Sequence, residues 1–389
     1  LSAANLAVNF VEARLLDQQD AYIKDATVKA YDVSVHSSFN ESDRQVAASA
    51  IIAGGGQGGG GSLSVSGISI NTNTAIADAA SKVTSLIENA SVDAKGKLSV
   101  KTLGNAIAKS DYSGSENAAA LLAFGVFVSK AATSGSFQAY VNNGAQNIGA
   151  ASLEILSQYT AVADACTTTP GKGVDVALAS GTVNLAQATV NADSTTVSGR
   201  ASLTSGGNVT IGNDVTVQVT GKGLANARSI GSKLSLSLMG IAVTDVYAYL
   251  QMKQDAYIQN SGSFTAGNVT VESLIDSSSY DGKVNYGTAN ASGGQATNDD
   301  YKTEEEKRKE ITLIGSDSVK TEAKTVSVNN AYLKGTGTNT MKAGKVKVFA
   351  RSVTGADTHS SMPDEIAGIA FNNVSSNAYT NDPVHAYLT

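Results

Sequence analysis

The stretch QDAYI at Gln19–Ile23 occurs a second time, unchanged, at Gln254–Ile258. Looser copies of its last three residues lie at 139–141, 331–333 and 386–388, and Ser85-Leu86-Ile87 lies where a further copy is expected. Self-similarity at a regular spacing is the sequence signature of a repeat protein. Two other phrases recur with this one.

A second phrase, in which polar and apolar residues alternate, follows the tyrosine phrase. Its first apolar residues are separated by steps of 55 to 77 residues and are Val33, Leu98, Leu153, Val209, Val269 and Val346. A third phrase, a glycine followed by apolar residues, precedes the tyrosine phrase and begins at Gly67, Gly125, Gly240 and Gly368. These phrases predict about six degenerate repeats of roughly 60 residues, each with three strand-like segments.

Alternation with a period of two places every second side chain on one face of a strand. One such unit buries little and leaves open edges, whereas stacked units pair their edges and merge their apolar faces into one core. We expect an all-β chain that forms a right-handed parallel β-helix, or β-solenoid, continuous over residues 1–389. Each repeat forms either one wide coil or two to three narrower ones. A β-propeller has shorter repeats, and immunoglobulin-like domains usually bury a tryptophan, which this chain lacks.

Composition and charge exclude several classes of protein. Charged residues make up 16% of the chain, the net charge is −6 and the pI is near 5.2, which argues against a nucleic-acid partner. Cys166 is the only cysteine, so no internal disulfide can form. The most apolar run, 118–128, is too short to cross a bilayer, so we expect no transmembrane segment in this part of the protein.

Residue types that often carry chemistry do not gather in the sequence. The glycine run 54–61 lacks the helix and acidic partner of a dinucleotide site, so we expect a loop there. The three histidines, His36, His359 and His385, lie far apart, and Cys166 has no neighbouring histidine. We therefore expect no catalytic residue and no cofactor-binding residue, and predict that the protein is not an enzyme.

Oxygen-rich turns at 298–300 and 381–382 raise the question of calcium. The glycine- and aspartate-rich nonapeptide of calcium-binding β-rolls does not recur in the chain. We favour a protein without a cofactor, keep calcium as the alternative, and leave a metal site open.

One segment, 296–312, breaks the low-charge composition. It predicts a charged insertion that forms a solvated loop or a short helix, since charges three and four residues apart can pair on a helix. An alternative interpretation is a lateral contact site for a neighbouring chain or ligand, formed by Glu304, Glu305, Glu306, Lys307, Arg308 and Lys309.

The three phrases together, such as GIAV at 240–243, DAYI at 255–258 and GNVTV at 267–271, resemble the repeats of giant bacterial filamentous adhesins. These are the filamentous-haemagglutinin-like and leukotoxin-type surface proteins of Gram-negative bacteria. The resemblance covers essentially the whole chain and implies a β-helical shaft that is secreted and displayed on the bacterial cell surface or shed. It implies a role in attachment and carries over no catalytic residue.

From these observations we expect the structural shaft of a secreted surface adhesin or extracellular filament. Its expected partners are a receptor or glycan on a host or neighbouring cell, with self-association as a further option. Long loops near 38–62 and 276–312 are the expected binding segments. Two alternatives stay open: a β-helical polysaccharide-degrading enzyme, and a self-assembling extracellular fibre subunit with open sheet edges.

Overall fold

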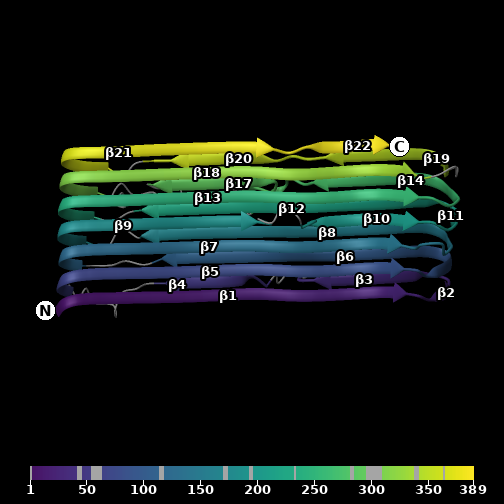
Figure 1. Cartoon of the computed structure of the whole chain (residues 1–389), viewed down its shortest axis with the longest axis horizontal. Helices are drawn as coiled ribbons and strands as arrows, with labels where there is room; N and C mark the ends of the chain where they lie inside the picture. Colours follow the sequence, from purple (N-terminus) through teal and green to yellow (C-terminus); the bar gives the residue numbers. More distant parts are fainter. Residues whose placement is uncertain are drawn as a thin grey trace.

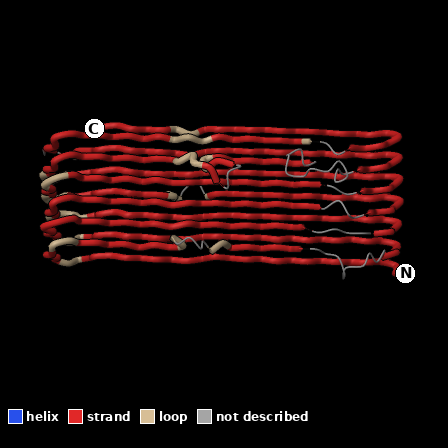
Figure 2. Tube along the Cα trace, turned by 180° about the vertical axis from the view of Figure 1, so that it is seen from behind, coloured by secondary structure: helices blue, strands red, loops and turns tan. Residues whose placement is uncertain are grey.

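All regular elements in the described residues are β-strands, and nearly all of them pair in parallel. The computed structural model describes residues 2–41, 46–53, 64–113, 118–169, 174–191, 196–231, 234–280, 284–294, 309–336, 341–361 and 364–389. The strands form two broad sheets that extend across the whole width of the molecule (Figure 1). The view from behind shows the same long strands, with loops confined to short segments (Figure 2).

Sheet A contains the longest strands, one or two from each passage of the chain. They are β1 (Ser2–Lys24), β5 (Ser64–Glu88), β7 (Ala118–Asn142), β9 (Val174–Val190), β10 (Gly199–Ser205), β13 (Leu234–Asn260), β18 (Lys309–Gly335), β21 (Asp364–Asn381) and β22 (Val384–Leu388).

Sheet B is built from the segments that follow each sheet A strand. They are β2 (Thr27–Ala30), β3 (Val33–Phe39), β4 (Ala48–Ala53), β6 (Ser91–Ser113), β8 (Ile148–Thr169), β11 (Val209–Ile211), β12 (Asp214–Gly231), β14 (Phe264–Ile275), β17 (Thr288–Gly294), β19 (Met341–Arg351) and β20 (Gly355–Ser360). A small antiparallel pair, β15 (Ser279–Tyr280) and β16 (Val284–Asn285), lies outside both sheets.

We call one passage through sheet A and then sheet B a coil. Each coil pairs with the same part of the next one, at steps between 54 and 75 residues in sheet A. The repeat predicted from the sequence is therefore one wide coil, not two or three narrow ones. The chain winds as a stack of such coils, and the sheet A strands of successive coils lie in order from one end of the stack to the other (Figure 1).

Copies of the tyrosine phrase occupy one register position, with Leu86 and Ser202 in place of the tyrosine in two of the coils. Tyr22 pairs with Leu86, Leu86 with Tyr140, and Tyr257 with Tyr332, and the chain of pairs ends at Tyr387. The predicted copy at 85–87 is confirmed, since Ile87 pairs with Ile23 and is fully buried. Alternation explains the arrangement, because the tyrosines point outward while their neighbours fill the core.

Five of the six predicted copies of the second phrase lie in one register, whereas the copy at Val209 and the third phrase are not arranged as the sequence suggested. The second phrase continues from Leu153 to Val215, whereas Val209 pairs with Ile148 in an earlier segment of the coil. The third phrase is out of register, because Gly240 pairs with Gly315 and with Ser180, neither of which begins a copy of that phrase. The third phrase also lies on the same long strand as the tyrosine phrase. Any alternating segment fits a strand equally well, so alternation alone does not fix which residues pair.

The core lies between the two sheets and is built from small and branched side chains. Ala75, Ala77 and Ala79 of β5 are fully buried, as are Leu98 and Val100 of β6. Buried hydroxyls cross the interior: Ser129 donates a hydrogen bond to Ser110 (2.9 Å), and Thr102 donates one to the carbonyl of Gln138 (2.8 Å). These bonds satisfy polar groups that have lost contact with water.

The two narrow edges of the stack differ in composition. The edge at which each sheet A strand begins, at the left in Figure 1, comprises residues 3–8, 67–72, 121–126, 178–183, 238–243, 313–318 and 368–373. We call it the apolar edge. The edge at which the chain turns from sheet A to sheet B, which we call the polar edge, comprises residues 25–32, 89–97, 143–152, 205–214 and 260–268.

Candidate functional surfaces

The predicted lateral contact site lies almost entirely outside the described residues. Glu304, Glu305, Glu306, Lys307 and Arg308 belong to the segment 295–308, of which the structure gives no description. Lys309 is the first residue of β18, where its backbone pairs with that of Asp364. Residues 309–312 are therefore strand and not part of a loop or helix, because they add to the ladder of sheet A.

The region near 276–312, which we expected to be a binding loop, is partly packed against the stack. Tyr280, Val284 and Tyr286 pack on an apolar cluster of Ile107, Val162 and Leu224 on the outer side of sheet B. The rings of Tyr280 and Tyr286 meet edge to face at 5.5 Å. Lys222 lies 5.3 Å from the ring of Tyr286 and pairs with Asp276 at 3.4 Å.

This hairpin connects several coils that are distant in sequence. Ile107, Val162 and Leu224 come from successive strands, β6, β8 and β12, at one register position. Ala47, from the first coil, packs against the same cluster. The described part of the predicted loop 38–62 likewise contains β4, a strand of sheet B, whereas the glycine run 54–61 lies outside the described residues. Both regions therefore have a clear structural role.

The thiol of Cys166 lies on β8 between Asp111 and Arg228 in the ladder of sheet B. Its Sγ lies 3.3 Å from the hydroxyl of Thr168. Burial raises the pKa of the Cys166 thiol, and the nearby positive charge of Arg228 offsets this only in part. A protonated thiol is a weak nucleophile.

The three histidines are exposed and lie on different strands: His36 on β3, His359 on β20 and His385 on β22. Among the residues that the structure describes, no group of three or more His, Cys, Asp or Glu side chains could hold a metal ion. Of the two oxygen-rich turns, 298–300 lies outside the described residues.

The second oxygen-rich turn has a structural role. One carboxylate oxygen of Asp382 accepts a hydrogen bond from the backbone N–H of Ser327 (2.6 Å), and the other accepts one from the hydroxyl of Thr354 (2.6 Å). The carboxylate thereby joins three segments of the last two coils where β21 ends and β22 begins. Sequence reasoning identified the oxygen atoms but not their donors, which come from other coils.

The clearest surface pattern is an aromatic ladder on the outer face of sheet A, formed by copies of the tyrosine phrase found in the sequence. The rings of Tyr257 and Tyr332 stack at 4.8 Å, and those of Tyr332 and Tyr387 at 5.1 Å. Nearby, Lys324 lies between the rings of Tyr249 (5.6 Å) and Tyr379 (5.4 Å). Stacked rings and cation–π pairs of this kind stabilise neighbouring strands.

The middle tyrosine of this ladder, Tyr332, has a hydroxyl that stays protonated at neutral pH. Burial, followed by the neighbouring Tyr257, Asp255 and Tyr387, raises the pKa of Tyr332 to about 12. The stacked rings present their edges and hydroxyls to solvent rather than their faces. The surface therefore offers hydrogen-bond donors and acceptors to a polar partner.

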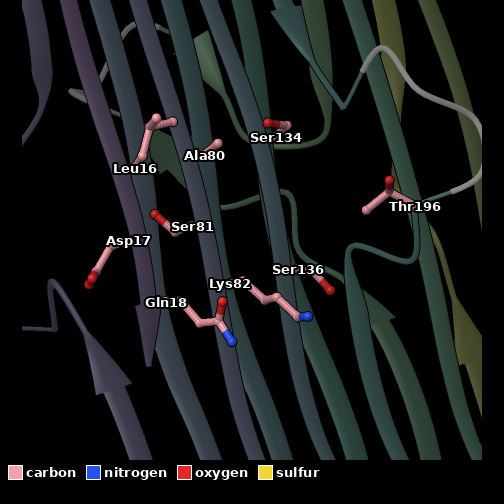
Figure 3. Close-up of a pocket in the computed structure, with 9 residues that line it drawn as sticks. All are labelled: Leu16, Asp17, Gln18, Ala80, Ser81, Lys82, Ser134, Ser136 and Thr196. Carbon is pink, nitrogen blue, oxygen red and sulfur yellow. The ribbon is translucent and has the colours of Figure 1, made fainter. Parts of the chain in front are cut away.

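A shallow hollow of about 530 Å³ lies on the same sheet, at the break between β9 and β10. Figure 3 shows Leu16, Ala80 and Ser134 on adjacent strands, with Thr196 contributed by the connection between β9 and β10. Lys82, Gln18 and Ser136 supply its polar groups. Its residues do not form a carboxylate pair or a nucleophile with a neighbouring base, so the hollow offers hydrogen bonds to a ligand but no evident acid–base chemistry.

The described part of the chain contains no helix that is long and apolar enough to cross a membrane. In comparisons with known proteins, no family model, no curated protein and no solved structure matches this chain.

Proposed function

We propose that this chain is part of the shaft of a bacterial surface adhesin or extracellular filament, built as a right-handed β-solenoid. The observation that carries the proposal is the register, in which the same phrase occupies the same position in successive wide coils. Right-handed winding is the expected form, because parallel crossover connections are right-handed in nearly all proteins. Display at the cell surface rests on the resemblance of the repeats to filamentous adhesins.

The geometry favours a stiff shaft over a long one. A strand such as β7 has 25 residues and spans about 80 Å, whereas each coil adds only about 4.8 Å along the stack. The described coils therefore form a blade that is wider than the stack is tall. A shaft of this kind is thick and resistant, since every coil is joined to the next by a ladder of backbone hydrogen bonds and by core packing.

A mechanical role is supported by features that serve cohesion between coils. The hairpin of Tyr280 and Tyr286, the stacked tyrosines and the Asp382 corner each join segments from different coils. Any contact with a host receptor or glycan would use the outer tyrosine ladder or the hollow near Lys82. In this proposal the protein is not an enzyme.

Single-molecule force spectroscopy on the whole chain tests the proposal. Coils that detach one at a time should release 54 to 75 residues per step, which is roughly 20–27 nm of chain at about 3.6 Å per residue. Extension at low force without discrete steps would argue against a shaft.

A parallel assay addresses the enzyme alternative. The chain is incubated with pectin and with host glycans, and new reducing or unsaturated ends are measured. The proposal expects none above a boiled control. Sustained product formation would favour the polysaccharide-degrading enzyme.

A further inference from the structure

The apolar edge is an exposed surface almost without charge. Its one charged residue is Asp317, whose side chain is only 2% exposed. One column of leucines follows successive coils: Leu121, Leu178, Leu238 and Leu313 are 58%, 50%, 52% and 59% exposed. These four residues come from β7, β9, β13 and β18, so the column crosses much of the stack.

A second apolar column runs beside the first. Ile68, Leu122, Met239, Ile314 and Ile369 hold one register position and are all exposed. Phe124, Ile241 and Phe371 extend the same surface by two residues along their strands. The result is a continuous apolar band along the stack, not a set of scattered side chains.

The band is larger than a monomeric protein usually leaves in contact with water. With about half of each large side chain exposed, the apolar area is on the order of 1,000 Å², against roughly 300–600 Å² for the largest patch of a typical monomer. One partner in a stable protein–protein interface contributes about 800 Å². The area is therefore sufficient for a specific interface.

The composition of the edge favours a protein partner over a membrane. Surfaces that lie on bilayers combine apolar side chains with lysine, arginine and interfacial tryptophan. The ranges that make up the apolar edge contain no lysine or arginine, and the chain contains no tryptophan. A neutral, straight, regularly spaced surface is matched best by another surface with the same spacing.

We propose that the apolar edge is the interface with a second copy of this chain, packed side by side along the stack. Both copies repeat their columns at the strand spacing of about 4.8 Å. The leucine column of one copy can therefore lie against that of the other at every coil, as in the dry interface between packed sheets. The association closes as a pair, since a self-complementary patch forms a two-fold dimer. It is independent of the adhesive role proposed above.

The two-fold arrangement predicts which coils meet. Of the seven coils that form the edge, the middle one contains β9. In a parallel or an antiparallel pair, Leu178 of that coil faces Leu178 of the other copy. Phe371, in the last coil, faces its own counterpart only in the parallel pair, and faces Leu6 of the first coil in the antiparallel pair.

Cysteine cross-linking tests this geometry in a Cys166→Ala background. Leu178→Cys is expected to form a disulfide-linked dimer under mild oxidation. Phe371→Cys alone, or mixed with Leu6→Cys, then tells the parallel pair from the antiparallel one. Leu16→Cys is the control, because Leu16 is 64% exposed on the face of sheet A, away from the edge. Equal cross-linking of Leu16→Cys and Leu178→Cys would overturn the proposal.

Sedimentation velocity over a range of concentrations measures the association itself. The double variant Leu178→Glu/Leu313→Glu is expected to weaken the dimer at least about tenfold, since it buries two charges in the interface. Leu16→Glu/Ile51→Glu adds the same charge at exposed apolar side chains elsewhere and is expected to leave the dimer intact.

Three results would contradict the proposal. A wild-type chain that stays monomeric at all concentrations, or dimers equally stable in both double variants, would exclude this interface. Flotation of the wild type with neutral phosphatidylcholine vesicles, lost in Leu178→Glu/Leu313→Glu, would assign the edge to lipid instead. Circular dichroism checks the fold of each variant. If the charged variant unfolds, the cross-linking of Leu178→Cys alone shows whether the apolar edge is the dimer interface.

Discussion

The two narrow edges of the stack turn the chain in different ways. At the polar edge the ladders are interrupted between Lys24 and Thr27 and at the equivalent places in other coils, which leaves backbone groups without ladder partners. At the polar edge, side chains supply partners from one coil to the next: Asn143 accepts from the backbone N–H of Ala90 (2.7 Å), and Asp32 accepts from that of Lys97 (2.6 Å). At the apolar edge the ladder of sheet A continues through the edge residues, and the side chains exposed there are mainly leucine and isoleucine.

The difference shows how a stack of coils can have one edge whose turns are held by hydrogen bonds and another edge whose exposed side chains can bind a partner. Left-handed backbone at Asp25 and Asn89 (φ 49° in both) allows sharp turns at the polar edge. The polar edge is therefore fixed by specific backbone geometry and side-chain hydrogen bonds. Behind the apolar edge the buried ring of Phe127 stacks on that of Tyr112, and the edge itself presents exposed side chains to a partner.

The largest effect is expected immediately behind the apolar edge. Phe127 is 2% exposed and stacks on Tyr112 with ring centroids 4.7 Å apart. We expect Phe127→Ala to lower the free energy of unfolding by about 4 kcal/mol, because a large buried ring leaves a cavity. Urea denaturation followed by circular dichroism measures the loss.

Phe124→Ala is the matched control, since Phe124 lies three residues away and is 45% exposed. Its expected cost is below about 1 kcal/mol. Equal losses for the two variants would mean that the edge is packed throughout and not exposed.

The next effect concerns a glycine at the polar edge. A Cβ on Gly262 would overlap the backbone carbonyl of Gly207 in the adjacent coil. We expect Gly262→Ala to cost about 3 kcal/mol, because the turns must move apart. Gly149→Ala, at the same edge, is expected to be neutral or slightly stabilising, since the nearest atom to its Cβ is Asp93 Oδ1 at 3.7 Å. Unfolding midpoints in urea compare the pair, and a tolerated Gly262→Ala would show that the turns are loosely stacked.

A smaller loss is expected from a buried amide of the polar edge. Asn143 is fully buried; its side chain accepts from Ala90 and donates to the carbonyl of Gln146 (3.2 Å). Asn143→Ala leaves these groups without partners and is expected to cost about 2 kcal/mol. Asn147→Ala removes a bond to the N–H of Asn208 that water can replace, because Asn147 is exposed. Thermal or urea unfolding that ranks Asn147 above Asn143 would contradict this account of the edge.

The smallest effect is a pH-dependent one in sheet B, beside the polar edge. Glu154 pairs with Lys97 (2.6 Å) and Lys101 (2.8 Å) of the preceding coil. Burial alone would raise the pKa of Glu154, but the hydrogen bonds and charges of the two lysines outweigh it and hold the pKa below its usual value.

A lowered folded-state pKa contributes stability above the unfolded pKa of about 4.3, and this contribution is lost as the pH falls through the folded value. Glu154→Gln is therefore expected to cost at most about 1 kcal/mol at pH 7, because the lysines are partly exposed. Urea titrations across pH measure the difference from wild type, which should vanish in acid. A difference that persists at low pH would mean that Glu154 acts through packing.

The tyrosine phrase could be found from the sequence because three consecutive residues recur together: an alanine that points inward, a ring that points outward and a branched residue that points inward. The three lie at the same place along the strand in successive coils. The second phrase misled at Val209, because β11 and β12 both alternate and only the structure shows that Val215 continues the ladder. The apolar third phrase predicted strands but not their exposure, since buried and exposed apolar residues look alike in a sequence. The packing of Tyr280 on Leu224, and the donors that hold Asp382, depend on contacts between coils that no local pattern encodes.

The central claim, that each repeat is one wide coil in a parallel stack, is tested most directly by distances between spin labels in a Cys166→Ala background. Ile241 and Lys253 lie on one strand, β13, so labels there should be about 40 Å apart at 3.3 Å per residue. Leu6 and Ile241 are four coil steps apart in the same ladder, so labels there should be only about 19 Å apart. Repeats folded as narrow coils would reverse the order, with a short first distance and a second of about 58 Å if each repeat formed three coils, and that result would contradict the account.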